Sequence, residues 1–98
     1  MWIVISYDFP SDKPVWYRHF RKGLLKSGFS FVQDSLCWRW VHSPERAESL
    51  CNSVRAALPP GGKILLWQLS DRAFASASWW EDGKSAAMPT PPEPWLII

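Results

Sequence analysis

Apolar residues recur along the chain with two different periods, and each change of period marks a new element. Residues 2–8 form an unbroken β-prone run that stops at the turn-forming residues 9–12, so we predict a strand there. The next apolar residues recur at helical spacing and predict a helix to about residue 27: Trp16, Tyr17, Phe20 and Leu24. Gly28 follows that helix at the position where a C-terminal cap favours glycine.

The middle of the chain predicts two further strands and a second helix. Residues 29–41 are rich in aromatic and branched side chains and suffice for two strands, provided that a bend or bulge falls near residues 35–37. Ser43 and Pro44 have the chemistry of a helix start, with serine as the cap and proline at the first helical position. One apolar face follows and ends before the prolines and glycines of residues 59–62: Ala47, Leu50, Val54 and Leu58.

The last third predicts one more core strand and a separate C-terminal segment. Residues 64–70 contain hardly a polar side chain and predict a strand, and residues 74–80 are a candidate for another. The resulting order βαββαβ is that of a ferredoxin-like α+β sandwich. From residue 81 onward the chain carries four of its nine prolines. We therefore expect a ferredoxin-like core over residues 1–80 and a proline-rich tether with an apolar docking segment over residues 81–98.

Both faces of the predicted sheet are apolar, although this topology places both helices on one face. The first strand presents Ile3, Ile5 and Tyr7 on one side, and Trp2 and Val4 on the other. An apolar sheet face without a covering layer usually marks an interaction surface. We therefore predict a homodimer that packs through the sheet faces.

Composition adds few constraints. A net charge of +2 over 98 residues does not by itself indicate a nucleic-acid-binding protein. The charges are segregated, because residues 13–26 contain five Lys or Arg residues and no acid. A strand-like run follows Met1 directly and no stretch is long and apolar enough to span a membrane, so we expect a cytoplasmic protein. Cys37 and Cys51 lack CxxC spacing, so we expect buried free thiols.

Asp8 is the main candidate for chemistry. It ends a hydrophobic strand on the side shared with Val4 and Ser6, which is the side left free for a second subunit. Two-fold symmetry would bring two Asp8 carboxylates together, where a divalent cation such as Mg²⁺ would relieve their repulsion. Such a metal can polarise a phosphodiester or generate a hydroxide nucleophile. The alternative is that Asp8 only caps the turn that follows it.

Basic side chains on the first predicted helix form a second candidate site. Arg18, Lys22 and Lys26 follow one another at i+4 spacing, and Arg21 lies alongside. Such a row neutralises backbone phosphates without reading the sequence, which suits a protein that accepts any nucleic acid. The alternative is a solvated amphipathic face, and Leu25 within the row indicates a protein contact there.

Other polar residues carry weaker signals. Arg39, between two tryptophans, fits either a phosphate-contacting cluster or a strand with one exposed arginine. His19 and His42 lack the spacing of a metal-binding pair, and Asp34 would add charge near a metal only if its strand lies beside Asp8. The absence of a glycine-rich phosphate loop and of GxSxG argues against a nucleotide-dependent enzyme and a serine hydrolase.

Six blocks of sequence, taken together in their order, resemble one family. Over nearly its whole length the chain is similar to CRISPR-associated protein two, particularly the versions that accompany type II systems. The blocks are the Met-Trp opening, Ser-Tyr-Asp-Phe-Pro at residues 6–10, Arg-Lys-Gly-Leu-Leu-Lys-Ser-Gly-Phe at 21–29, Val-Gln-Asp-Ser at 32–35, Ser-Pro-Glu-Arg-Ala-Glu at 43–48 and Leu-Pro-Pro-Gly-Gly-Lys at 58–63.

The resemblance implies a homodimer of ferredoxin-like subunits in which Asp8 is a divalent-metal ligand. Some members of that family are described as metal-dependent ribonucleases or deoxyribonucleases. The dimer also bridges the adaptation integrase, CRISPR-associated protein one, and binds the duplex DNA that becomes a new spacer. By resemblance, the expected phosphate contacts are Arg18, Arg21, Lys22 and Lys26. The segment from Met88 is expected to dock on the integrase through its apolar end: Trp95, Leu96, Ile97 and Ile98.

Two main functions therefore stay open. An adaptor in spacer acquisition needs a rigid dimer, a basic track and a docking tail, and this is the function that we favour. A Mg²⁺-dependent endonuclease would depend on Asp8 pairs, although two-metal nucleases normally gather several carboxylates. A ribonuclease toxin of the same fold, or a ferredoxin-like small-molecule regulator, is a third possibility.

Overall fold

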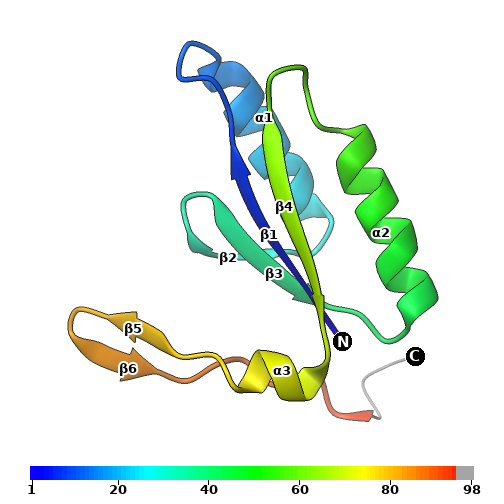
Figure 1. Cartoon of the computed structure of the whole chain (residues 1–98), viewed down its shortest axis with the longest axis vertical. Helices are drawn as coiled ribbons and strands as arrows, with labels where there is room; N and C mark the ends of the chain where they lie inside the picture. Colours follow the sequence, from blue (N-terminus) through cyan, green and yellow to red (C-terminus); the bar gives the residue numbers. More distant parts are fainter. Residues whose placement is uncertain (95–98) are drawn as a thin grey trace.

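A computed structural model of the chain describes residues 1–94. Its elements are, in order, β1 (Trp2–Asp8), α1 (Pro14–Lys26), β2 (Ser30–Gln33), β3 (Leu36–Trp40), α2 (Pro44–Ala56), β4 (Lys63–Leu69), α3 (Asp71–Ala75), β5 (Trp79–Glu81) and β6 (Lys84–Ala86). The first four strands form one antiparallel sheet in the order β2-β3-β1-β4 (Figure 1). This order confirms the ferredoxin-like α+β fold.

Local chemistry at the helix ends follows the sequence. The Ser43 hydroxyl accepts a hydrogen bond from the Arg46 N–H at 3.1 Å and caps α2. Gly28, with φ +86°, supplies the left-handed residue after α1. Residues 29–41 form the two expected strands, which a turn at residues 34–35 separates, and the register of β2 shifts between Phe31 and Gln33.

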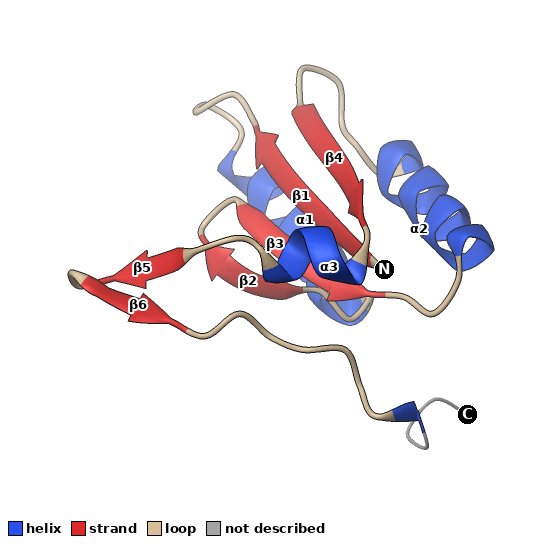
Figure 2. Cartoon of the chain, turned by 60° about the horizontal axis from the view of Figure 1, so that its bottom comes forward, coloured by secondary structure: helices blue, strands red, loops and turns tan. Residues whose placement is uncertain are grey.

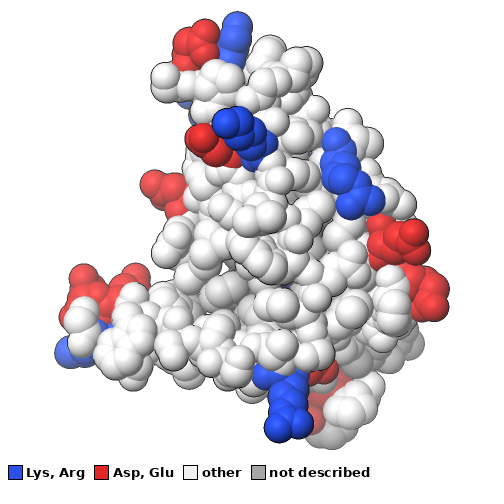
Figure 3. Space-filling view, viewed as in Figure 1, with Lys and Arg blue, Asp and Glu red and all other residues white. Residues whose placement is uncertain are grey.

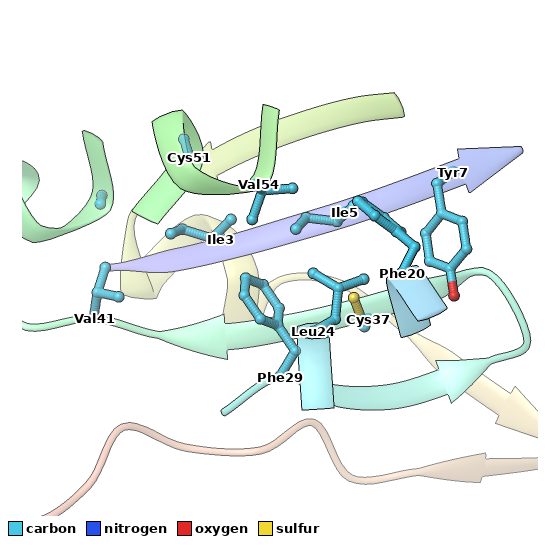
Figure 4. Packing of buried hydrophobic residues seen from close by; sticks show 11 residues of the cluster. Ile3, Ile5, Tyr7, Phe20, Leu24, Phe29, Cys37, Val41, Cys51 and Val54 are labelled. Carbon is cyan, nitrogen blue, oxygen red and sulfur yellow. The ribbon is translucent and has the colours of Figure 1, made fainter. Parts of the chain in front are cut away.

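The main core lies between the sheet and the two long helices. Helices α1 and α2 cover the same face of the sheet (Figures 1 and 2). Figure 4 shows side chains from β1, β3, α1 and α2 converging between these layers. The buried members of this cluster are Ile3, Ile5, Tyr7, Phe20, Leu24, Phe29, Cys37, Val41, Ala47, Cys51 and Val54. Both cysteines are buried free thiols, as expected.

The predicted strand over residues 74–80 is confirmed only at Trp79 and Trp80, which belong to β5, because a short helix, α3, forms at residues 71–75. The Ser70 hydroxyl accepts a hydrogen bond from the Ala73 N–H at 3.1 Å and caps this helix. Phe74 then points onto the second face of the sheet, where its ring stacks on Trp2 with centroids 4.1 Å apart. Helix α3 therefore covers one end of the face that we expected to be open.

Strands β5 and β6 form a separate two-stranded hairpin that projects from the body of the molecule (Figures 1 and 2). Its turn consists of Asp82 and Gly83, both with positive φ, as a tight type I′ hairpin requires. At its base Trp79 packs edge-on against Trp38, whereas Trp80 is 66% exposed. Within residues 1–94, no helix has the length and apolar character needed to cross a membrane.

Candidate functional site

The part of the second sheet face that α3 leaves free forms an apolar surface, which we call the open face. It consists of Val4 and Ser6 on β1, Leu36 on β3, and Leu65 and Trp67 on β4. Leu65 is 55% exposed and Trp67 is 39% exposed. In the view of Figure 3, uncharged atoms cover most of the middle of this surface, and charged side chains lie mainly around it. Such a patch is typical of a protein interface.

Asp8 lies at the end of β1, at the edge of the open face. Strand alternation puts it on the same side as Val4 and Ser6, because Ile5 and Tyr7 point into the core. Its carboxylate is solvent-exposed, and its register partner across the sheet is Lys63 on β4. Residues 1–94 contain no group of three or more His, Cys, Asp or Glu residues placed to hold a metal ion. One subunit therefore offers a single acid at this site.

The loop after Asp8 is held by a close contact with the loop before β4. A Cβ atom on Gly62 would lie 2.7 Å from the ring of Phe9, which is closer than real Cβ contacts allow. The ring of Phe9 also packs against Tyr7 and Phe20, with centroids 5.5 and 5.1 Å apart. Because Gly62 has no side chain, the ring of Phe9, the residue after Asp8, can pack against the core.

The basic row on α1 is only partly free. Arg18, Lys22 and Lys26 are exposed, and the buried residues of the helix point the other way, toward the core. Leu25, 50% exposed, lies among them. These three cations form a stripe that we call the α1 stripe.

Arg21 does not share this freedom, because its guanidinium binds within the fold. It donates a hydrogen bond to the Asp34 carbonyl at 3.2 Å and lies 3.9 Å above the ring of Phe31. The hydroxyls of Tyr7 and Tyr17 also donate to the Asp34 carbonyl. Burial, followed by the proximity of Tyr17, raises the pKa of the Tyr7 phenol above its ordinary value. Asp34 thus ties the β2–β3 turn to α1 through its backbone.

Arg39 is also engaged within the fold. It lies on the helix side of β3, opposite Ile3, and donates a hydrogen bond to the Ser27 carbonyl at 2.6 Å. This contact satisfies a carbonyl at the C-terminal end of α1. Burial lowers the pKa of the Arg39 guanidinium from its ordinary value. Arg39 is therefore not part of the α1 stripe, and it links β3 to the C-terminal end of α1.

Comparison with known proteins identifies the family. Residues 1–77 match the family described as CRISPR associated protein Cas2. The chain belongs to the Cas2 family. Two curated proteins similar to it are named CRISPR-associated endoribonuclease Cas2. The one from Paracidovorax avenae is 34% identical over 79% of this chain and 74% of its own length. The one from Flavobacterium psychrophilum is 36% identical over 76% of this chain and 67% of its own length.

A solved structure supports the fold of this Cas2 family member. The crystal structure of Streptococcus pyogenes Cas2 at pH 6.5 superposes with a TM-score of 0.55 and covers 71% of this chain and 87% of that chain. Its sequence identity is 20%, so the likeness concerns the fold alone. The family membership establishes a CRISPR-associated role.

The remaining predicted residues fall in three places. The turn that contains Asp34 lies beside the end of β1, since the Tyr7 N–H donates to the Ser35 carbonyl at 3.0 Å. His42 is exposed before α2 and His19 is exposed on α1. The predicted docking residues lie outside the described part of the chain: Trp95, Leu96, Ile97 and Ile98.

The sequence alone did not indicate three contacts near the site: Lys63 opposite Asp8, Gly62 against Phe9, and Phe74 on Trp2. The Pro-Pro-Gly-Gly run before Lys63 signals a loop, but its contact with Phe9 depends on tertiary packing. The apolar pattern predicts Phe74 in a strand, although Ser70, three residues before Ala73, has the chemistry of a helix cap.

Proposed function

We propose that this Cas2 protein is the homodimeric adaptor of CRISPR spacer acquisition, which bridges the adaptation integrase and binds protospacer duplex DNA by its backbone. The α1 stripe is the observation that carries this proposal. Its three cations are exposed along one rigid helix, and a row of this kind binds phosphates without base contacts. Arg21 and Arg39 support the fold around this stripe instead.

The open face is the proposed dimer contact. Its centre is the exposed ring of Trp67, next to Val4 and Leu65. A two-fold axis through this face would cover these side chains and leave α1 of each subunit on the outside, because α1 lies on the opposite face of the sheet. The two α1 stripes would then lie on the outer surfaces of one dimer, available for a duplex.

Sedimentation of a matched pair of variants tests the dimer. Trp67→Glu puts a charge at the centre of the open face, whereas Leu25→Glu puts one on the exposed side of α1. We expect wild type and Leu25→Glu to sediment as dimers at tens of micromolar, and Trp67→Glu as a monomer. A monomeric wild type, or a dimeric Trp67→Glu, would remove the open face as the contact.

Fluorescence anisotropy of a labelled DNA duplex, measured at two salt concentrations, tests the α1 stripe. Lys22→Gln with Lys26→Gln removes two cations of the α1 stripe and lowers the net charge by two, and Arg55→Glu, on the exposed side of α2, lowers the net charge by the same amount and serves as the control. The stripe variant should bind more weakly and lose about 0.9 of the log–log salt slope for each phosphate contact removed. An equal loss of affinity and of salt slope in Arg55→Glu would mean that duplex binding depends on net charge alone and not on the α1 stripe.

The C-terminal segment is the proposed site of integrase docking, separate from the ferredoxin-like core. We place the core at residues 1–80 and the proline-rich tether and docking segment at residues 81–98. Removal of residues 95–98 tests this division: binding to the purified integrase should be lost, while the dimer and its affinity for duplex DNA should be unchanged.

Endoribonuclease activity is the second candidate, because the curated relatives are named endoribonucleases, and we expect such an activity to depend on a divalent metal. Mg²⁺ is commonly held by one or two carboxylates together with substrate phosphates and water. Two Asp8 residues, one from each subunit, would fit this requirement at the edge of the open face. When bound, the metal would polarise the phosphodiester and stabilise the charge that develops on it.

Asp8→Asn separates the two candidate functions. The variant keeps the shape of the side chain and removes its charge, so the dimer and duplex binding should be unchanged. If Asp8 holds a catalytic metal, Mg²⁺-dependent RNA cleavage by the wild type should fall by at least about 100-fold, a loss of ~2.7 kcal/mol in transition-state stabilisation. Cleavage that persists in purified Asp8→Asn would exclude Asp8 as the centre of the activity.

A further inference from the structure

The proline-rich segment after β6 lies on the body of the molecule rather than extending from it. The chain runs back from the hairpin beneath the end of the sheet (Figure 2). Met88 is half-buried in an apolar hollow next to Trp38 and Phe74. Beyond it, Pro89, Thr90 and Pro92 line a cavity of about 320 Å³. We call residues 88–92 the strap.

The spacing of the strap residues is that of a polyproline II helix. This helix has three residues per turn, so residues three apart share one side. Pro89 and Pro92 are three apart and both line the cavity, whereas Pro91 does not line it. Proline fixes φ near the polyproline II value, so little conformational entropy remains to be lost when such a segment binds.

Half of the residues in the opposite wall of the cavity are tryptophans. Trp2, Trp38 and Trp40 line it, together with Gly28, Ser30 and Arg39. Aromatic-lined grooves are the usual receptors for polyproline II segments.

One indole in this wall has an unused hydrogen-bond donor. The buried Nε1 of Trp2 has no acceptor among the described residues, whereas the Nε1 of Trp40 donates to an Asp71 carboxylate oxygen at 3.1 Å. A buried donor without an acceptor costs about 1–3 kcal/mol. The backbone carbonyls of a polyproline II helix make no internal hydrogen bonds, so they are suitable acceptors.

We propose that this tryptophan-lined cavity is a binding site for proline-rich peptide segments in the polyproline II conformation, and that the strap of the same chain is its occupant. In this bound arrangement the strap moves from the rim of the cavity onto the indoles, and one of its carbonyls accepts the Trp2 indole N–H, which has no acceptor in the arrangement that the structure describes. The site thereby fixes the direction in which the chain leaves the core. The cavity volume lies at the lower end of the ~300–1,000 Å³ typical of ligand pockets.

Indole N–H resonances of the full-length protein test this proposal. Pro89→Ala with Pro92→Ala alters the two prolines that line the cavity, and Pro91→Ala is the control at a proline that does not line it. The Trp2 and Trp38 indole signals should shift in the double variant and stay in place in Pro91→Ala. The signal of Trp80, on the projecting hairpin, is the internal reference. Equal shifts in both variants would overturn the proposal.

A synthetic peptide that reproduces residues 86–94 tests the site itself. Added to the double variant, it should move the Trp2 and Trp38 signals back toward their wild-type positions, and its Pro89→Ala, Pro92→Ala counterpart should bind at least about tenfold more weakly. Failure of the peptide to bind would overturn the site. In a Trp67→Glu background, which removes the proposed dimer contact, Trp2 and Trp38 signals that move with protein concentration would show that a second copy fills the cavity, and would overturn the intramolecular strap.

Discussion

Phe74→Ala tests how α3 is fastened to the sheet. The Phe74 side chain is only 2% exposed, stacks on Trp2 at 4.1 Å and meets the ring of Trp38 edge-on at 5.1 Å. Helix α3 has five residues, which is far too short to be stable without these contacts. Removing the ring therefore removes these contacts between α3 and the sheet, and it exposes Trp2.

The size of the effect follows from burial. Replacing a buried phenylalanine by alanine costs about 3–5 kcal/mol. Phe74 borders an apolar hollow into which the surroundings can relax, so we expect a value near the lower end, about 3 kcal/mol. That is a large share of the ~5–15 kcal/mol that stabilises a typical domain.

Urea unfolding at one fixed protein concentration measures this loss. A loss of about 3 kcal/mol would lower the midpoint by roughly 1–3 M for slopes of ~1–3 kcal/mol/M. Phe74→Leu, which keeps most of the volume, should lose less than about 1.5 kcal/mol. A loss under ~1 kcal/mol in Phe74→Ala would refute the reasoning, because it would mean that α3 contributes nothing to the folded state.

Three further predictions concern the loops and the buried groups. Gly62→Ala should displace the ring of Phe9 and lower the free energy of unfolding by roughly 1–3 kcal/mol in the same assay. In the control Gly83→Ala the new Cβ meets no atom within 4 Å, so any loss of stability comes from the positive φ of residue 83 alone. Arg39→Met should destabilise the protein by about 1.5–3 kcal/mol through the lost bond to Ser27, and an unchanged salt slope of duplex binding would confirm that it contacts no phosphate. Burial raises the pKa of Cys37 from 9.0 to about 12. Between these pH values the unfolded thiol ionises while the folded thiol stays protonated, so the free energy of unfolding should fall as the pH rises. Urea midpoints that decline as steeply with pH in Cys37→Ala would contradict this origin.

The sequence predicted the elements that depend on local chemistry. The cap at Ser43, the glycine at residue 28 and the period of the core residues are local signals, and each appears in the structure as expected. The position of Asp8 on the open face also follows from strand alternation.

The sequence could not show which basic residues are free. Arg18 and Arg21 are three positions apart on one helix, but only Arg21 can reach the Asp34 carbonyl and the ring of Phe31. Arg39 looked exposed between two tryptophans, although pairing of β3 with β1 turns it toward the end of α1. These differences arise from contacts between segments that are distant in sequence.

The C-terminal part shows a signal that was present and not used. Asp82-Gly83 is the strongest short-range indicator of a hairpin, and a tight turn forms there. The expectation of a continuous strand over residues 74–80 failed because Ser70 starts a helix, which separates this hairpin from the main sheet.

The projecting hairpin makes the protein convenient to label. A Cβ at Gly83 would meet no atom within 4 Å, so a cysteine there could carry a fluorophore, with only the strain of its positive φ to accommodate. The two native cysteines are buried, so a thiol reagent would modify the introduced one selectively. Because the hairpin extends from the base of the sheet, a small rotation at that base becomes a large displacement of the dye. Energy transfer between two labelled subunits would therefore report changes in their relative orientation during assembly.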